Sequence, residues 1–185
     1  MVDGGETTTD VQMTGHLRET LPRSASVIEA FRQVVSTDHS GQIVLDIAND
    51  LASQHRRQWH AEDVSRADDT SAEDVAACKQ LIDELNARRV ALVERIDAWA
   101  AQEIHSRADA SLHTETLGSV IDRLAIAWVR TNNLINATDT RERARLALRQ
   151  LAELADAYDD LVRDVVAGHR RLPAWRSLKS YRRTS

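Results

Sequence analysis

Apolar residues recur at steps of three and four along most of the chain, which is the spacing of one face of an α-helix. The clearest row follows Ser71, a residue type that caps helices, with Glu73 and Asp74 in the first turn, where the helix dipole favours carboxylates. Its members are Val75, Cys78, Ile82, Leu85, Arg89, Leu92, Ile96 and Trp99. We therefore predict a long helix whose apolar seam contains one charged residue, Arg89.

Two helices are predicted before this seam. A short helix begins at Ser24 or Ser26, whose side chains can cap it, and is expected to bury Val27, Ile28, Phe31, Val34 and Val35. The next helix runs from about Ser40 to Arg66, and its apolar stripe consists of Val44, Ile47, Ala48 and Leu51. The stripe then continues at helical spacing as His55, Trp59, Glu62 and Arg66, with Asp63 beside them. The face has therefore become polar.

Two helices are predicted after the seam. Thr114 or Thr116 caps the first, whose stripe is Leu117, Ile121, Leu124, Trp128, Thr131 and Ile135. Thr138 or Asp139 starts the second, Gly168 ends it, and its apolar positions are Leu146, Leu148, Leu151, Leu154, Tyr158, Leu161 and Val165. Pro173 suits the first turn of a short C-terminal helix. The sequence thus predicts an all-α bundle of about five helices, four long or medium and one short.

Composition sets the expected domain limits. Residues 1–22 are rich in threonine, glycine and aspartate and contain few large apolar groups, so we predict a disordered tail followed by one helical-bundle domain over residues 23–185. Cys78 is the only cysteine, which suits a reducing compartment. No apolar run approaches the roughly 20 residues of a spanning helix, and the N-terminus lacks a signal-peptide pattern. A cytoplasmic location is the resulting expectation.

The net charge of −5 argues against nucleic acid as a partner, because no overall positive field draws the chain to phosphates. The C-terminus is the exception, since it combines basic and aromatic residues: Arg170, Arg171, Trp175, Lys179 and Tyr181. This segment can bind phosphate, an acidic partner or a membrane surface. The alternative is a basic tail packed across the acidic residues of the bundle.

Arg89 is the most informative residue, because a guanidinium in a helix–helix seam is unfavourable unless carboxylates pair with it. The candidate acids are Glu62, Asp63, Glu115 and Asp122, of which Asp122 is the first choice. Lys79, Asp83 and Asn86 share one face of the Arg89 helix and can extend the polar cluster. Two interpretations stay open, a structural ion-pair network and a ligand pocket.

The sequence contains no Glu-x-x-His pair of the kind that binds metals in helical bundles, so no metal site is predicted. It also lacks a glycine-rich phosphate loop and a nucleophile elbow, and no cofactor is expected. If the chain is an enzyme, Asp63 and Asp122 are the candidate catalytic bases. The row His55, Trp59, Glu62 and Arg66 can place an imidazole and a carboxylate together for proton transfer, and the alternative is that the row is an exposed helix face.

Three segments resemble a bacterial helical family known as domain of unknown function 4254. Residues 59–66 and 79–89 are similar to its patterns W-x-x-E-D-x-x-R and K-x-x-I-D-x-L-N-x-x-R, and residues 114–124 to S-E-T-P-G-S-x-x-D-R-L, with Leu117 in place of proline. The segment from Gly168 to Tyr181 resembles the family's basic and aromatic ending, where Arg182 and Arg183 replace asparagine and aspartate. The family motifs include Glu62, Asp63, Arg66, Asp83, Asn86, Arg89, Glu115, Asp122 and Arg123.

The resemblance implies a cell-surface glycan context and no particular reaction, because members of the family are often encoded near glycosyltransferases. The leading hypothesis is a non-catalytic accessory protein that binds a partner such as a glycosyltransferase. The alternative is an enzyme or binder of a sugar or sugar phosphate, in which Arg66, Arg89 and Arg123 hold an anion. A homodimer through the long seam is compatible with either hypothesis.

Overall fold

The computed structural model describes residues 21–32, 41–67, 70–136 and 141–174. In chain order the elements are α2 (Ser24–Ala30), α3 (Gln42–Ser65), α4 (Ala72–Glu103), β1 (Ser111–Leu112), α5 (Leu117–Asn136), α6 (Arg141–Val166) and β2 (Arg170–Arg171). Four long helices and one short helix within these residues confirm the predicted all-α bundle. None of the described helices combines the length and the apolar character that crossing a membrane requires.

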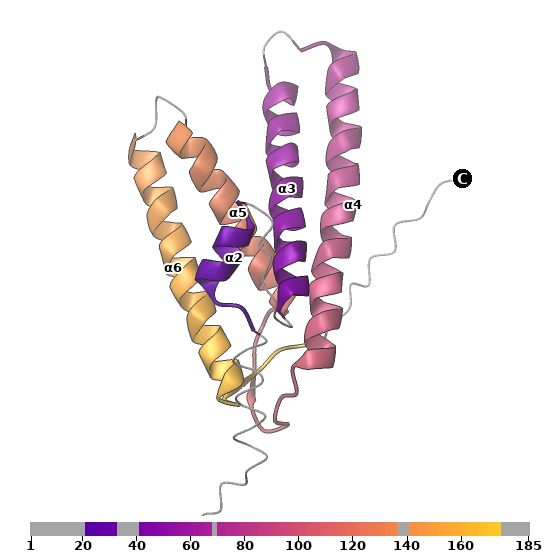
Figure 1. Ribbon diagram of the computed structural model, residues 1–185. Helices are drawn as coiled ribbons and strands as arrows, with labels where there is room; N and C mark the ends of the chain where they lie inside the picture. The colour runs from indigo at the N-terminus through magenta and orange to yellow at the C-terminus, as the bar shows by residue number, and fades with distance from the viewer. Residues whose placement is uncertain (1–20, 33–40, 68–69, 137–140, 175–185) are drawn as a thin grey trace, which may run out of the picture.

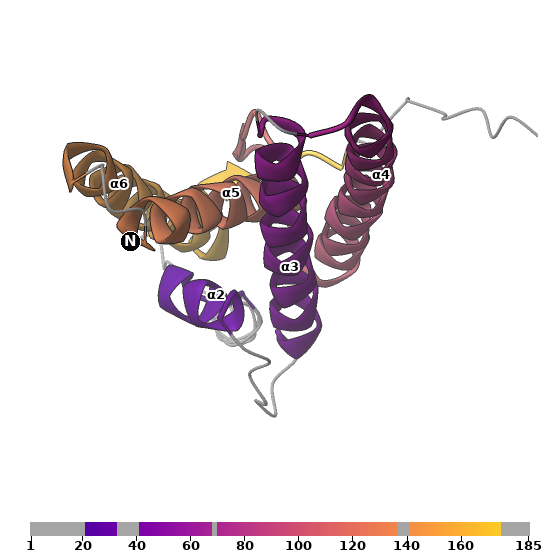
Figure 2. The ribbon, with the colours of Figure 1, turned by 90° about the horizontal axis from the view of Figure 1, so that it is seen from above.

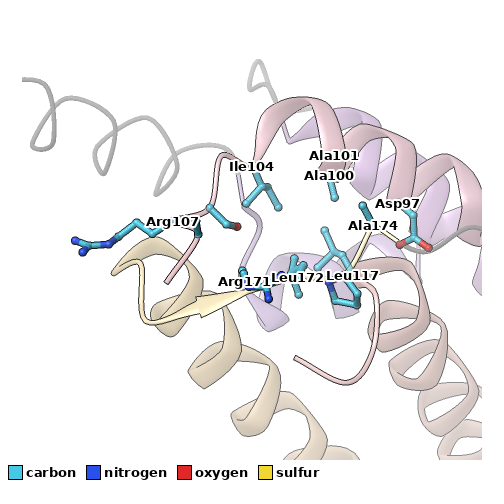
Figure 3. A pocket seen from close by; sticks show the side chains of 12 residues that line it. Asp97, Ala100, Ala101, Ile104, Arg107, Leu117, Arg171, Leu172 and Ala174 are labelled. Carbon is cyan, nitrogen blue, oxygen red and sulfur yellow. The ribbon is translucent and has the colours of Figure 1, made fainter. Parts of the chain in front are cut away.

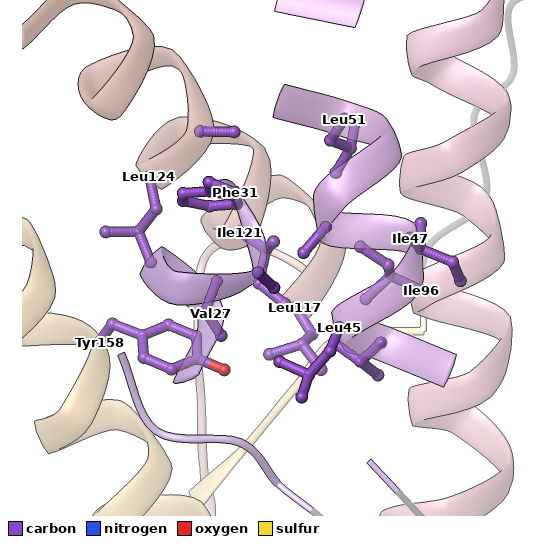
Figure 4. Close-up of a cluster of buried hydrophobic side chains, with 14 of the residues drawn as sticks. Val27, Phe31, Leu45, Ile47, Leu51, Ile96, Leu117, Ile121, Leu124 and Tyr158 are labelled. Atoms are coloured by element: carbon purple, nitrogen blue, oxygen red, sulfur yellow. The ribbon is translucent and has the colours of Figure 1, made fainter. Parts of the chain in front are cut away.

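The long helices form two hairpins. Figure 1 shows α3 beside α4 and α5 beside α6, with the short helix α2 lying across the opening between the pairs. The view from above shows α2 on one side of the molecule, against α3, α5 and α6 (Figure 2). All five helices contribute to one apolar cluster, whose fully buried side chains include Phe31, Leu51, Ile96, Ile121 and Tyr158 (Figure 4).

Helix α2 is too short to be stable alone, and neighbouring helices bind both of its ends. At the N-terminal end, Asp159 of α6 accepts hydrogen bonds from the backbone N–H of Ser24 (2.8 Å) and from its hydroxyl (3.0 Å). At the other end, Asn49 and Arg56 of α3 donate to the carbonyl groups of Ala30 and Phe31 at 2.7 and 2.8 Å. Ser24 is therefore a helical residue tied to α6, and the prediction that a serine side chain caps this helix was wrong.

The ends of α5 and α6 follow the sequence signals. Thr116, the second of the two predicted caps, accepts a hydrogen bond from the backbone N–H of Ser119 at 3.2 Å. Gly168 has a φ of +72° and ends α6, where the N–H of His169 donates to the carbonyl of Asp164 and the N–H of Gly168 to that of Val165. This is the Schellman pattern, in which a glycine adopts the left-handed conformation just after the helix.

Two very short strands join the loop before α5 to the segment after α6. Ser111 pairs in parallel with Arg170, and Leu112 pairs with Arg171. These strands are not predictable from the sequence, because a run of two residues carries no alternating pattern. Of the predicted C-terminal helix, Pro173 and Ala174 are described and are not helical, and the remainder lies outside the described residues.

Other differences from the prediction concern which residues the neighbouring helices bury. Val75, Cys78 and Ile82 are only half-buried, because the α3–α4 hairpin extends past the end of the α5–α6 hairpin (Figure 1). Leu21 is buried and the carbonyl of Pro22 accepts a hydrogen bond from Tyr158, so packing begins before the predicted domain start at residue 23. The remaining predicted tail residues, 1–20, lie outside the described residues, as do Val34 and Val35.

Helix α5 begins unusually close to α4. The backbone N–H of Gly118 donates to the Asp97 carboxylate at 2.7 Å, and a Cβ atom added to Gly118 would lie 2.5 Å from the carbonyl oxygen of Val93 and 2.8 Å from Oδ1 of Asp97. Any larger residue at position 118 must therefore push the two helices apart.

We expect Gly118→Ala to lower the free energy of unfolding by about 1–3 kcal/mol, because the added methyl group overpacks the contact with α4. The direction of this change tests the close contact, because Gly→Ala at an unhindered helix position raises the free energy of unfolding by about 1 kcal/mol. Urea unfolding monitored by circular dichroism measures it. An unchanged or raised stability would contradict the close approach.

Candidate functional site

Three helices meet at one buried carboxylate. The carboxylate of Asp122 on α5 accepts from Arg89 of α4, whose Nε–H is shared between the two carboxylate oxygens at 3.0 Å each and whose terminal nitrogen donates at 2.8 Å. Nε2 of His55 on α3 lies 2.8 Å from the same carboxylate. We call these three residues the central cluster. Its existence confirms that an acid faces Arg89 and that Asp122 is this acid.

The members of the central cluster differ in exposure. The side chains of Asp122 and His55 are 7% and 8% exposed, whereas that of Arg89 is 36% exposed. Burial alone would raise the pKa of Asp122, but its hydrogen bonds with His55 and Arg89 outweigh burial and hold that pKa below its ordinary value. The carboxylate is therefore ionised at neutral pH and only accepts, so Nε2 of His55 carries the proton.

This arrangement suits a structural role better than proton transfer. A general base works best when its pKa lies near the working pH, and Asp122 is shifted in the opposite direction. Its carboxylate is also occupied by two side chains of neighbouring helices. Asp63, the other candidate base, is exposed on α3.

The three arginines proposed to hold an anion lie in separate ion pairs. Arg66 binds Glu62 within α3 at 2.9 Å, Arg123 binds Glu115 at 2.6 Å, and Arg89 binds Asp122. The first two pairs are largely exposed, since the arginine side chains are 70% and 59% accessible. Each of the three arginines is therefore paired with a different acid.

The remaining predicted members lie around the central cluster without joining it. Trp59 packs half-buried against the apolar core, and Asn86 is half-buried on α4. Lys79 and Asp83 are exposed on α4. Within the described ranges, none of Lys79, Asp83 and Asn86 forms a hydrogen bond or ion pair with the central cluster.

His55 is the member that the sequence analysis did not include. Its row was expected either to bring an imidazole and a carboxylate together for proton transfer or to be exposed, yet His55 is buried and contacts Asp122 of another helix. The signal was its position four residues after Leu51, one helical turn further along a stripe that is otherwise buried.

Of the C-terminal basic and aromatic residues, two are described. Arg170 pairs with Asp164 of α6 at 3.5 Å, and Nε of Arg171 donates to the carbonyl of Ala110 at 3.1 Å. Trp175, Lys179 and Tyr181 lie outside the described residues. In the described part of the chain, no group of three or more histidine, cysteine, aspartate or glutamate side chains is arranged to hold a metal ion.

We expect Asp122→Ala to lower the free energy of unfolding by about 2–3 kcal/mol, because it leaves the buried His55 and the guanidinium of Arg89 without their acceptor. The partial exposure of Arg89 keeps the loss below that of a fully buried pair. Glu115→Ala, which breaks the exposed pair with Arg123, is the matched control and is expected to lose less than about 1 kcal/mol. Equal losses of unfolding free energy in the two variants would show that the central cluster stabilises the fold no more than an exposed ion pair does.

The lowered pKa of Asp122 also predicts a pH dependence. The ordinary value is 3.8, so as pH falls the unfolded chain takes up this proton before the folded chain does. The stabilisation is complete above about pH 5 and is lost as pH falls below 3.8 toward the folded pKa. The stability difference between the wild type and Asp122→Asn, measured by urea unfolding, should therefore shrink from pH 5 to pH 3. A constant difference would contradict this assignment.

Comparison with known proteins identifies a family. A family model described as "Protein of unknown function (DUF4254)" matches residues 46–174, from the first turns of α3 to the segment after β2, which is more than half of the chain. Neither the curated proteins nor the solved structures contain a match. The matched range includes the whole central cluster. The chain belongs to the DUF4254 family of proteins of unknown function.

Proposed function

We propose that this protein acts by binding another protein, and that its binding surface is the groove between α5 and α6. The groove has a volume of about 380 Å³ and is lined by apolar residues of both helices, Ile126, Ala127, Ala147 and Leu154. Arg123, Arg130, Gln150 and Glu153 also line it. Leu146, next to Ala147, is 53% exposed. A concave apolar surface between two helices suits the apolar face of a partner helix.

The charge around the groove indicates an acidic partner. Arg130 is exposed and, within the described residues, belongs to no ion pair. The first ten residues of α6 contain one acid and four exposed arginines, namely Arg141, Arg143, Arg145 and Arg149. This excess of positive charge lies on a chain whose net charge is −5. Complementary potentials favour a negatively charged segment here.

The basic start of α6 is unfavourable for the helix itself. Positive side chains near a helix N-terminus oppose the macrodipole, and like charges four residues apart repel each other, as at Arg141, Arg145 and Arg149. Leu148 is 47% exposed on the same helix, so the apolar positions predicted at Leu146 and Leu148 are not part of the core. These arginines and leucines disfavour the helix or the solvated surface without contributing to the core. Such positions are expected where a surface binds a partner.

A protein fits this surface better than a membrane does. The groove is concave, whereas a bilayer presents a flat surface, and the negative net charge of the whole chain disfavours approach to anionic lipid. The family resemblance makes a glycosyltransferase of cell-surface polysaccharide synthesis our expectation for the partner. The single observation that carries the proposal is the groove lined by apolar residues of α5 and α6 and by Arg130, which belongs to no ion pair among the described residues.

The test uses a fluorescein-labelled amphipathic helical peptide with leucines on one face and glutamates on the other, titrated with the full chain and followed by fluorescence anisotropy. We expect saturable binding, weakened about tenfold or more by Arg130→Glu, which reverses a complementary charge in the lining, or by Leu146→Glu, which places a negative charge one residue from Ala147 of the lining. Arg88→Glu, on the exposed face of α4, is the matched control and should bind like the wild type.

A second peptide replaces the glutamates with lysines and is expected to bind at least tenfold more weakly. Equal binding of the two peptides, or equal effects of Arg88→Glu and Arg130→Glu, would overturn the proposal. Stronger association with phosphatidylserine vesicles than with the acidic peptide would assign the surface to a membrane instead.

A further inference from the structure

A second cavity lies at the opposite end of α5 from the hairpin turn, where the loop after α4 meets the segment after α6. Its volume is about 300 Å³, within the range of small-molecule sites. Ala100, Ala101 and Ile104 of the α4 end form one side, while Leu117 of α5 and Leu172 and Pro173 of the C-terminal segment also line it. The parallel pairing of β1 with β2 holds these two segments together.

Two opposite charges line this cavity without neutralising each other. Figure 3 shows Asp97 at one edge of the cavity and Arg171 apart from it, beside Leu172, while the guanidinium of Arg107 extends away from the cavity. Arg107 pairs with Asp109 at 3.1 Å. Across the residues that the structure describes, Asp97 and Arg171 take part in no ion pair. Both side chains are only partly buried.

Each group is held in place by one backbone contact that leaves further hydrogen-bonding capacity. The carboxylate of Asp97 accepts from the N–H of Gly118 at 2.7 Å, and Nε of Arg171 donates to the carbonyl of Ala110 at 3.1 Å. The two terminal nitrogens of Arg171 have no partner among the described residues, and a planar guanidinium presents them in a geometry that suits a carboxylate.

The ionised form of Asp97 is disfavoured in the folded protein. Burial raises the pKa of Asp97, and the hydrogen bonds from Gly118 and Thr116 offset this only in part. A group whose folded pKa is raised is less favourably ionised in the folded chain than in the unfolded chain. A nearby cation supplied by a ligand would relieve this penalty.

We propose that this cavity binds a small amino-acid-like zwitterion, whose carboxylate contacts Arg171 and whose ammonium group contacts Asp97. The aliphatic part of the molecule lies against Ile104, Leu117 and Leu172. A ligand with a single charge pairs with only one of Asp97 and Arg171, and an uncharged apolar ligand pairs with neither. The site is separate from the α5–α6 groove and does not depend on the function proposed for that surface.

The test titrates the full chain with a series of ω-amino acids from 3-aminopropanoate to 6-aminohexanoate, which vary the separation of the two charges, and follows binding by calorimetry. Hexanoate and hexylamine carry one charge each and are the matched probes. We expect one member of the series to bind saturably and at least tenfold more tightly than either single-charge molecule, because each charge-assisted contact is worth about tenfold or more.

Two variants test whether the ligand carboxylate contacts Arg171 and the ligand ammonium group contacts Asp97. Arg171→Gln and Asp97→Asn should each weaken zwitterion binding about tenfold or more, and Arg171→Gln should leave hexylamine binding unchanged. Asp97→Asn keeps an oxygen acceptor for Gly118 and should unfold at no lower temperature than the wild type at pH 7. Arg170→Gln, which alters the neighbouring residue paired with Asp164, should bind like the wild type.

The proposal is overturned if no ω-amino acid binds more tightly than hexanoate and hexylamine. It is also overturned if Arg170→Gln and Arg171→Gln weaken binding equally, since the effect would then come from general charge loss. Failure of the acidic-peptide test leaves these results unaffected, because that test concerns Arg130 and Leu146 at another surface.

Discussion

The carboxylate of Asp122 sets the positions of three helices relative to one another. Arg89 reaches it from α4 and His55 from α3, and each contact is a directional hydrogen bond that a slip of either helix by one turn would break. Apolar contacts between helices are less selective, because leucine and isoleucine side chains repack at modest cost. A buried charged cluster therefore contributes to the specificity of the arrangement, whereas the apolar core supplies most of the stability.

The central cluster was partly visible in the sequence. Arg89 interrupts an apolar seam, and electrostatics then requires an acid on a facing helix, which led correctly to Asp122. His55 was missed, because a polar residue on a helix stripe is usually exposed, and only its spacing from Leu51 indicated burial. Helical periodicity defines which face of a helix is apolar but does not define how far the neighbouring helices extend.

That limit explains the other errors. Val75 and Ile82 continue the α4 seam, yet they are half-buried where α5 and α6 no longer reach. Leu146 has the right residue type for a core and lies outside it. The contact between Asp97 and Gly118 had one signal, a glycine inside an otherwise helical segment, which indicates a close backbone approach but not its partner. The partner is defined only by the tertiary fold.

The parallel pairing of β1 with β2 has a mechanical consequence for the α5–α6 hairpin. Residues just before α5 and just after α6 are hydrogen-bonded to each other, so the two helices are joined at that end by backbone and at the other by their connecting residues. The β1–β2 pairing therefore restricts separation of α5 from α6 at one end, and outward bowing near the middle of the pair leaves this pairing intact. Ile126 and Leu154 lie near this middle part, so a partner that enters the groove as proposed would widen it there while β1 and β2 stayed paired.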